Sequence, residues 1–435
     1  MSKGLWVGGV IVLAGAGYAA GTVYTGQQVN EQFNKYVESV KQSSSASVAV
    51  TSSVDASLFS SANTLTFEMN DLPESILELT GTNVMSFNID YSHSFLASKS
   101  VMTLAEGELL ANIKSYQKNT QIAPLIINSH YSYDIASNKV KIVGDLATDN
   151  FVFKDDANEL SIGASAGSFS LADESMNLDW LVQPSLYVNE LGRADIGALG
   201  WKQTAQVLSG DILTAGLAQK GDAQVTLDSF KVDGSGTKLD ISKLLVNVAQ
   251  DVVADRIKVK VTYAADSIVS ENAYDQFEFK KPVLDLSFDL DFQGASLFVD
   301  GIGELQKDAG GIAANPAALM DLLSGITNKG IVFNVDRVEV EANDAALKGD
   351  AQLKLAPFAV QEAMFDREAF MKKVDLNAKL VMANKFLEYL PNYNPEQISF
   401  FVGMGFLSEE GDDLAIKLAV KDGVINLNGQ PMPGF

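Results

Sequence analysis

The chain has 435 residues, of which 47% are hydrophobic and 20% charged, so it is too long for one compact core and is neither disordered, collagenous nor a polytopic membrane protein. Acidic residues outnumber basic ones 55 to 32, for a formal net charge of −23, so nucleic acid and anionic membrane surfaces are poor partners. The sequence has no Cys and only two His, which excludes disulfides and thiolate sites and leaves little room for metal or general-base chemistry.

An uncharged, apolar segment spans residues 4–24 and follows the single charged residue Lys3. A helix of this length crosses the hydrocarbon core of a bilayer, and Trp6 and Tyr24 near its two ends suit the membrane interfaces. The sequence therefore predicts a transmembrane anchor over residues 1–26. Because positive charge favours the cytoplasmic side, we expect the acidic remainder beyond the bacterial inner membrane, in the periplasm.

Two alternatives apply to the same segment. Ala14-Gly15-Ala16 resembles the cleavage site of a signal peptide, although the apolar character continues to Tyr24. Residues 15–20 match the G-x-G-x-x-G/A dinucleotide fingerprint. That fingerprint needs a second buried strand, but residues 28–41 are polar with helical spacing, so no cofactor is expected.

Glycines of the apolar segment form two small-xxx-small pairs, Gly4 with Gly8 and Gly17 with Gly21. Such pairs let two helices approach closely within a membrane, so the sequence predicts a homo-oligomer formed partly through the anchor. Glycine is also frequent in membrane helices that make no such contact, and a dimer contact in the body is the alternative.

An amphipathic helix is predicted over residues 27–42, followed by two β-rich regions over residues 43–220 and 221–435. The Ser-rich stretch 43–61 is either a spacer or an irregular first strand. Beyond it, apolar and polar residues alternate with the period of two that is typical of strands. The alternating runs are residues 131–136, 139–143, 160–171, 223–232, 256–263, 283–292, 331–341 and 414–427. Short turn signals between several of them predict antiparallel pairing.

Asp422-Gly423 is the strongest turn signal and predicts a two-residue type I′ hairpin turn. Both turn residues then need positive φ, which Gly adopts at no steric cost. The side chains expected on one apolar face are those of Ile416, Leu418, Val420 and, across the turn, Val424.

Helices are predicted to interrupt the sheet over residues 240–252, 316–329 and 357–371, and after Asn394-Pro395. The helix at 316–329 has Asn315-Pro316 at its start and Gly330 as its stop. Antiparallel strands with inserted helices predict a β-rich α+β fold, here an elongated body behind the N-terminal transmembrane helix.

These features together resemble the YdgA-like family of bacterial envelope proteins. The residues that carry the resemblance are Lys3, the Gly-rich apolar helix, Tyr24-Thr25-Gly26 with Val29, and the hairpin around Lys421-Asp422-Gly423-Val424 that closes on Asn428-Gly429. The resemblance implies an inner-membrane anchor with a periplasmic β-rich body, and it assigns no activity. The strand-Asp-Gly-strand-Asn-Gly pattern also looks like AsmA-type envelope proteins, which are associated with phospholipid handling.

Three motifs suggest chemistry, and each has a simpler interpretation. Residues 163–167 match the G-x-S-x-G nucleophile elbow, but both histidines, His93 and His130, precede Ser165, and the run reads as a strand. We expect both histidines to be surface or half-buried polar residues. Residues 289–300 resemble the start of an EF-hand loop, yet a solvated strand face explains the same acids. No catalytic, cofactor-binding or metal-binding residue is predicted.

Three functions compete. The first is a non-enzymatic, membrane-anchored protein that binds lipid or an envelope partner, and it requires an apolar strip that the protein's own helices leave uncovered. The second is a dimeric structural scaffold without ligand, in which helices or a second protomer fill every such strip. The third is a hydrolase that uses paired carboxylates, and a close pair of buried acids in a cleft would favour it.

Overall fold

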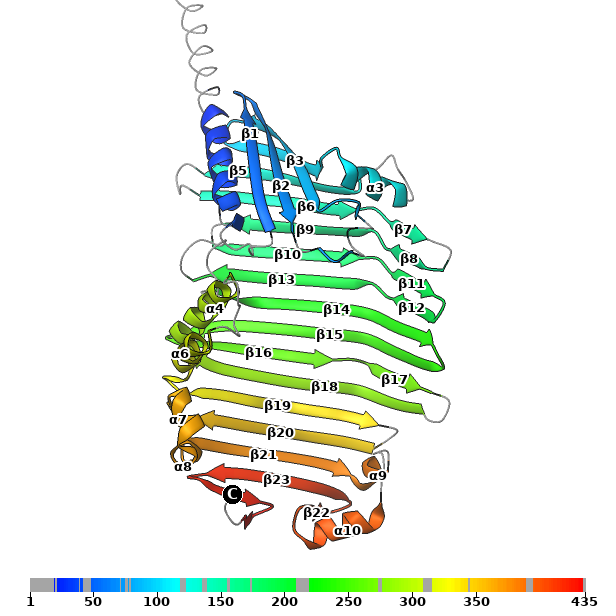
Figure 1. Ribbon diagram of the computed structural model, residues 1–435, viewed down its shortest axis with the longest axis vertical. Helices are drawn as coiled ribbons and strands as arrows, with labels where there is room; N and C mark the ends of the chain where they lie inside the picture. Colours follow the sequence, from blue (N-terminus) through cyan, green and yellow to red (C-terminus); the bar gives the residue numbers. More distant parts are fainter. Residues whose placement is uncertain are drawn as a thin grey trace, which may run out of the picture. The chain divides into compact units, whose positions relative to one another are not determined.

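The computed structural model of the chain is a β-rich α+β fold, as predicted (Figure 1). It describes residue 19 and residues 22–38, 40–41, 48–70, 72–74, 77, 80–117, 123–134, 139–154, 157–172, 174–208, 219–272, 276–307, 315–342, 345–388 and 394–432. Residue 19 and residues 22–26 of the predicted anchor are described, and Thr22 and Thr25 are buried in the fold, whereas the other residues of the anchor lie outside the described residues. Among the residues that are described, no helix has both the length and the apolar character needed to span a membrane.

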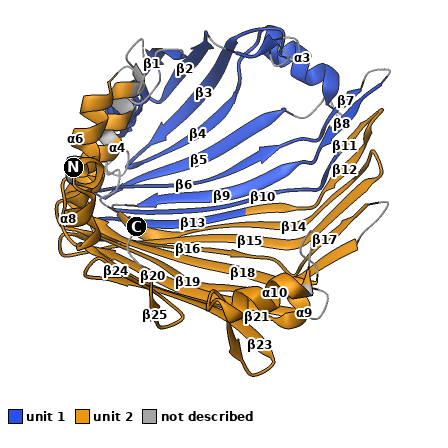
Figure 2. Ribbon diagram, turned by 60° about the horizontal axis from the view of Figure 1, so that its bottom comes forward, with its two compact units in different colours: residues 1–186, 201–215 blue, residues 187–200, 216–435 orange. Residues whose placement is uncertain are grey.

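The chain forms two compact units, of residues 1–186 with 201–215 and of residues 187–200 with 216–435 (Figure 2). We call them unit 1 and unit 2. The chain passes between them within β11 (Ser185–Asn189) and β13 (Leu199–Val207).

Unit 1 is an antiparallel sheet with a helix over residues 22–38. Its other elements are β1 (Val48–Ala56), β2 (Ser60–Met69), β3 (Val84–Ser94), β4 (Ala97–Leu104), α3 (Glu108–Tyr116), β5 (Leu125–Asp134), β6 (Lys139–Thr148), β7 (Phe151–Lys154), β8 (Glu159–Ile162), β9 (Ser165–Ala172) and β10 (Ser175–Val182). The strands pair in the order β1-β2-β3-β4-β5-β6-β9-β10. The Ser-rich stretch thus contains a strand, β1.

Unit 2 is also built of antiparallel strands, with helices between them. Its elements are β12 (Gly192–Ile196), β14 (Gln219–Gly234), β15 (Thr237–Val253), β16 (Arg256–Ala264), β17 (Ser267–Glu271), β18 (Gln276–Asp291), α4 (Phe292–Lys307), α6 (Pro316–Thr327), β19 (Ile331–Ala342), β20 (Ala345–Leu355), α7 (Val360–Phe365), α8 (Arg367–Met371), β21 (Val374–Ala383), α9 (Asn384–Leu387), α10 (Pro395–Gly403), β22 (Ser408–Glu410), β23 (Asp413–Lys421), β24 (Val424–Leu427) and β25 (Gln430–Pro431). The long strands pair in the order β14-β15-β16-β18-β19-β20-β21-β23.

The register of unit 2 separates apolar from charged side chains, as the alternation predicts. Across β16 and β18, Val259 lies opposite Phe288, whereas Lys258 lies opposite Asp289. Directly opposed residues of an antiparallel pair share a face, so one face is apolar and the other charged.

Residues 240–252, predicted as a helix, lie instead within strand β15. The apolar positions of this segment fit the helical period of 3.6 residues, and they also fit the strand period of two. Val248 lies opposite Ala223 on β14 and Val261 on β16. Hydrogen bonding to a strand on each side outweighs the weak helical preference of a β-branched segment.

Two other sequence predictions need correction. Residues 160–171 form two strands, β8 and β9, rather than one. Residues 357–371 form two short helices, because Asp366 interrupts the pattern and its side chain caps α8 by accepting from the Ala369 amide. The helices α6 and α10 begin at Pro316 and Pro395 as predicted.

The hairpin turn at Asp422-Gly423 is confirmed. Asp422 and Gly423 have φ of 52° and 79°, and Lys421 pairs with Val424 across a two-residue turn. The prediction for Val424 is wrong, because this register places it on the face of Lys421. Ile425, which lies opposite Val420, continues the apolar face instead.

Candidate functional site

The helix of unit 1 lies beside the first strands of the sheet (Figure 1), and its apolar side chains pack against them. Its buried residues Val29, Phe33 and Val37 form one cluster with side chains of the first three strands, which are Val50, Leu65, Ile89 and Tyr91. The predicted amphipathic spacing is therefore correct, although the helix begins before residue 27. This contact fixes the helix over one end of the sheet.

A cavity of about 550 Å³ lies between the helix and the sheet. Its apolar lining comes from the helix and from β2 to β6 and β9: Val29, Phe33, Leu65, Ile89, Met102, Ile127, Val140, Ile142, Phe169, Leu171 and Ala172. Its polar lining consists of Gln32, Lys139, two serines and three tyrosines. A volume of this size with a mostly apolar wall and a few polar groups is typical of small-molecule binding sites.

Strand register explains why this lining lies on one face. Met102 is opposite Ile127 on the neighbouring strand, and Ile142 is opposite both Tyr131 and Leu171. A single residue shift in any of these strands would turn its apolar side chains to the other face.

Gly144 shapes the floor of the cavity. A Cβ atom at residue 144 would lie 2.5 Å from the ring of Phe169, so only Gly lets that ring lie across β6. Phe169 lines the cavity, and the missing side chain at residue 144 thus sets the position of one of its walls.

A buried polar cluster lies beside the cavity, under the helix. The His93 imidazole has Nδ1 3.0 Å from the Ser98 hydroxyl and Nε2 3.3 Å from the Ser61 hydroxyl. Ser61 also donates to the Asn30 side chain of the helix, at 3.1 Å. His93 is only 6% exposed, so the prediction of a surface or half-buried residue was wrong for this histidine, while His130 is exposed.

The environment of His93 and Tyr91 favours their uncharged forms. Burial lowers the pKa of His93, which makes the neutral imidazole the folded form near neutral pH. Burial, with the neighbouring Tyr131, raises the pKa of Tyr91 far above its usual value. The Tyr91 hydroxyl in the cavity wall is therefore a neutral hydrogen-bonding group.

This arrangement suits binding better than nucleophilic catalysis. Ser61 and His93 approach each other, but both are buried beneath the helix, at 3% and 6% exposure, where a substrate has no access. The cavity itself presents alkyl and aromatic groups with scattered hydroxyls. Such a wall accommodates an alkyl chain, whose burial is favourable in proportion to its apolar area.

The site residues predicted from the sequence, where the structure describes them, do not line this cavity. Tyr24, expected at a membrane interface, lies in the helix with its hydroxyl 3.1 Å from that of Tyr133. Lys3, Trp6, Gly4, Gly8, Gly17 and Gly21 lie outside the described residues. Ser165 of the G-x-S-x-G match begins strand β9, and its hydroxyl is bonded to that of Thr148 at 2.8 Å.

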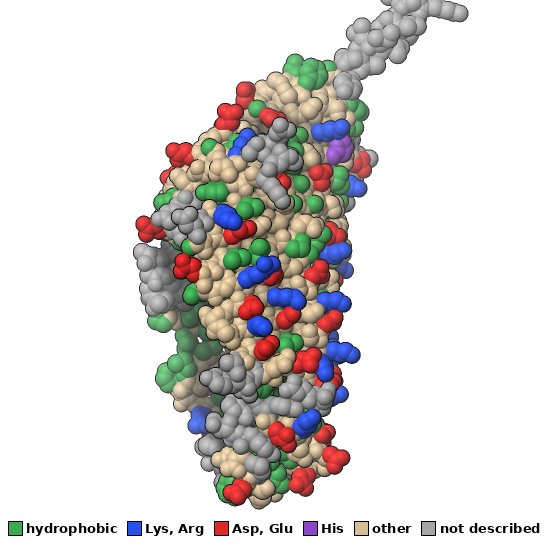
Figure 3. Space-filling view, turned by 90° about the vertical axis from the view of Figure 1, so that its right-hand side faces the viewer, with side chains coloured by type: hydrophobic (Ala, Val, Ile, Leu, Met, Phe, Trp, Pro, Cys, Tyr) green, Lys and Arg blue, Asp and Glu red, His purple; other side chains and the backbone are tan. Residues whose placement is uncertain are grey.

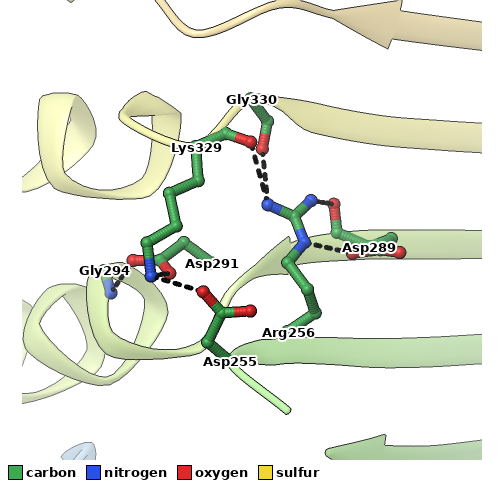
Figure 4. Close-up of polar contacts among 7 residues, drawn as sticks. All are labelled: Asp255, Arg256, Asp289, Asp291, Gly294, Lys329 and Gly330. Atoms are coloured by element: carbon green, nitrogen blue, oxygen red, sulfur yellow. Dashed lines mark hydrogen bonds and ion pairs between the residues drawn. The ribbon is translucent and has the colours of Figure 1, made fainter. Parts of the chain in front are cut away.

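Two acids of the EF-hand match, Asp289 and Asp291, take part in ion pairs of unit 2 (Figure 4), and the side chain of Asp300 lies outside the described residues. Asp289 binds the Arg256 guanidinium at 2.5 Å, and Asp291 binds the Lys329 ammonium at 2.7 Å. The other oxygen of Asp291 accepts from the Gly294 amide at 2.8 Å, at the start of α4. A helix, not a strand, thus follows these acids, contrary to the sequence-based interpretation.

The apolar face of the unit 2 sheet is a second apolar surface. Phe288, Phe333 and Leu353 lie side by side on β18, β19 and β20 and are only half-buried. Helices α4 and α6 contact β18, and α9 contacts β20 and β21. In Figure 3, charged side chains gather over much of the visible face, and hydrophobic ones are visible in a hollow at its lower left.

The sequence missed the cavity and the His93 cluster. Alternation identified the apolar strand faces, but it could not say which of them a helix covers fully and which it covers in part. The signal that could have located the cavity is the row of small or polar residues on otherwise apolar faces, such as Ser100 and Ser129, which leave space beneath the helix.

No curated protein and no solved structure matches the chain. A family described as "Bacterial protein of unknown function (DUF945)" matches residues 1–434, almost the full length. The fold and sites described above thus belong to a bacterial protein, and this chain is a member of the DUF945 family.

Proposed function

We propose that the protein is a non-enzymatic, inner-membrane-anchored periplasmic protein that binds the alkyl chain of a lipid in the cavity of unit 1. The observation that carries this proposal is the cavity of about 550 Å³ under the helix, with its mostly apolar wall. Ligand sites have this size and this composition. The half-buried apolar face of unit 2 supports the same class of ligand.

The proposed location depends on the N-terminal segment. Residues 4–24 carry no charge and follow Lys3, which favours a single anchor with the body in the periplasm. The resemblance to YdgA-like proteins and the looser one to AsmA-type proteins support the same location. N-terminal sequencing of the membrane-extracted protein tests it, and a mature chain that starts near Gly17 or Gly21 would show that the segment is removed.

Site-specific photo-crosslinking tests lipid binding in the full-length protein. We expect p-benzoylphenylalanine at residue 142, in the cavity wall, to capture an alkyl-containing lipid in cells, detected as an added mass on the purified protein. The matched control is residue 141, the exposed neighbour of Ile142 on the other face of β6. Equal lipid capture at both residues, or none at residue 142, would contradict the proposal.

A filled cavity provides a second test. Ser129→Trp should place an indole among the lining residues and reduce lipid capture from residue 142. His130→Trp places the same side chain on the exposed face of the same strand, and it should leave capture unchanged.

The alternative function is a dimeric envelope scaffold without ligand. The half-buried apolar face of unit 2 favours it, since a second copy could cover that face. Benzoylphenylalanine at Leu353, on this face, would then capture another copy of the protein rather than a lipid. That result, together with no lipid at residue 142, would favour the scaffold.

A further inference from the structure

Unit 2 contains a strongly basic groove in an acidic protein. The groove has a volume of about 340 Å³ and lies where β19 and β21 begin and where β20 and β23 end. Six of its fourteen lining residues are basic, against 32 of 435 in the whole chain. They are Arg256, Lys329, Lys354, Lys372, Lys373 and Lys421.

Two of these six cations are already neutralised within the fold (Figure 4). Lys329 lies 2.8 Å from Asp255 and 2.7 Å from Asp291. Arg256 binds Asp289 and also donates to the carbonyl oxygens of Lys329 and Gly330. These two residues therefore build one wall of the groove rather than supply free positive charge.

The remaining lysines contrast with three lysines farther along β20, β21 and β23. On β20, Lys348 pairs with Glu339 at 2.8 Å, and on β21, Lys379 pairs with Glu410 at 3.0 Å. Lys417 of β23 pairs with the same glutamate. Each of these lysines thus has a carboxylate partner close by.

At the groove, the same strands present lysines that form no ion pair among the described residues. Lys354 of β20 and Lys421 of β23 are exposed, and neither forms an ion pair within the described residues. In the described part of the chain, Lys372 pairs only with Glu368, one turn away on the same helix, and the Glu368 side chain is 85% exposed. Such a pair contributes little and separates easily.

The carboxylates in the groove wall offset this charge only in part, because two of them face the four remaining lysines. They are Asp375, which lies directly opposite Lys354 on the neighbouring strand and accepts from the Asn377 side chain at 3.2 Å, and Asp422 of the hairpin turn. Lysines that outnumber the carboxylates around one groove repel one another, and a bound anion relieves that repulsion. Lysine is a phosphate-binding residue, and charge-assisted hydrogen bonds to phosphate are among the stronger polar contacts.

We propose that this groove binds a phosphate-bearing anion through Lys354, Lys372 and Lys421. Side chains of the apolar face also reach the groove, at Ile331, Leu355 and Val374. The anion is therefore either a soluble phosphate or the headgroup of a phospholipid, and both share the same recognition chemistry. The site lies in unit 2 and does not depend on the cavity of unit 1.

The test uses the full-length protein in a neutral, phosphate-free detergent, with its lysines labelled by ¹³C reductive methylation, which keeps their charge. The probes are inorganic phosphate, dihexanoyl phosphatidylglycerol and dihexanoylglycerol, and the last lacks the phosphate. We expect phosphate or phosphatidylglycerol, but not dihexanoylglycerol, to shift the signals of Lys354 and Lys421. A shift with inorganic phosphate alone identifies a soluble ligand, and a much tighter response to phosphatidylglycerol identifies a lipid headgroup.

Two triple variants make the test specific. Lys354→Gln with Lys372→Gln and Lys421→Gln should weaken binding of the active probe at least tenfold. Lys348→Gln with Lys379→Gln and Lys417→Gln removes three lysines of the same sheet and should keep binding within twofold. Absence of any phosphate-dependent shift, or equal weakening in both triples, would overturn the proposal. Because the cavity of unit 1 is tested separately by crosslinking, failure here leaves that test unaffected.

Discussion

Gly26 of the unit 1 helix lies against the imidazole of His93. A Cβ atom at residue 26 would lie 3.0 Å from His93 Cδ2 and 3.3 Å from Nε2. The imidazole is held by Ser61 and Ser98, so it cannot easily move away. The absence of a side chain at residue 26 therefore allows the helix to sit close to strand β3 and to cover the polar cluster.

Gly26→Val should lift the helix from the sheet. The branched side chain overpacks a fixed contact, and such changes cost about 1–3 kcal/mol of folding free energy. Hydrogen exchange of the full-length protein should show faster exchange over residues 22–38 and in β3. Gly403→Ala, at the end of α10 where a Cβ meets open space, is the control and should leave that exchange unchanged. Unchanged protection in Gly26→Val would mean that the contact does not fix the helix.

The stability of unit 1 should depend on pH through His93. Burial lowers the pKa of His93 below its usual 6.5, so near that pH the unfolded chain binds more protons than the folded one. The contribution of neutral His93 to the free energy of unfolding is then fully present above pH 6.5. It is lost as the pH falls below 6.5 toward the pKa of the folded state.

Denaturant unfolding at pH 7.5 and pH 5.5 measures this effect. His93→Gln should show a smaller loss of stability between the two pH values than the natural chain. His130→Gln, which replaces the exposed histidine, should show the same loss as the natural chain. Equal losses in all three proteins would assign the pH dependence to other groups.

Gly423→Val should destabilise the hairpin of β23 and β24. Gly423 has φ of 79°, and a β-branched residue in this region costs about 1–3 kcal/mol. The thermal midpoint of the protein should fall measurably. Gly423→Asn should have a smaller effect, because Asn tolerates positive φ. A midpoint that does not move in Gly423→Val would argue against a strained turn.

Gly17→Ile with Gly21→Ile should reduce self-association of the anchored protein. If paired helices approach through these small residues, two branched side chains push them apart. Chemical crosslinking in membranes should then yield less dimer. Leu5→Ile with Leu13→Ile changes bulk little and serves as the control. Undiminished crosslinking in the glycine variant would place any dimer contact in the body.

Local signals in the sequence were sufficient to predict turns and helix starts, because these depend on residues that are close together in the chain. Asp422-Gly423 specified a two-residue turn because only a few residue types adopt positive φ, and Asn394 specified the start of α10 because its side chain accepts from the Glu396 amide. The division of β18 into an apolar and a charged face was also evident, because side chains alternate along any strand.

Tertiary structure decided the features that depend on distant partners. Residues 240–252 have apolar spacing compatible with a helix, and pairing with β14 and β16 made them a strand. The face of Val424 is not among these features, because the two-residue turn by itself pairs Lys421 with Val424 and places both on one face. The burial of His93 and the cavity beside it depend on a helix more than fifty residues earlier in the chain packing on β3. Burial comes from contacts between segments that are distant in sequence. The alternation of apolar and polar residues along one segment does not indicate which other segment packs on its apolar face.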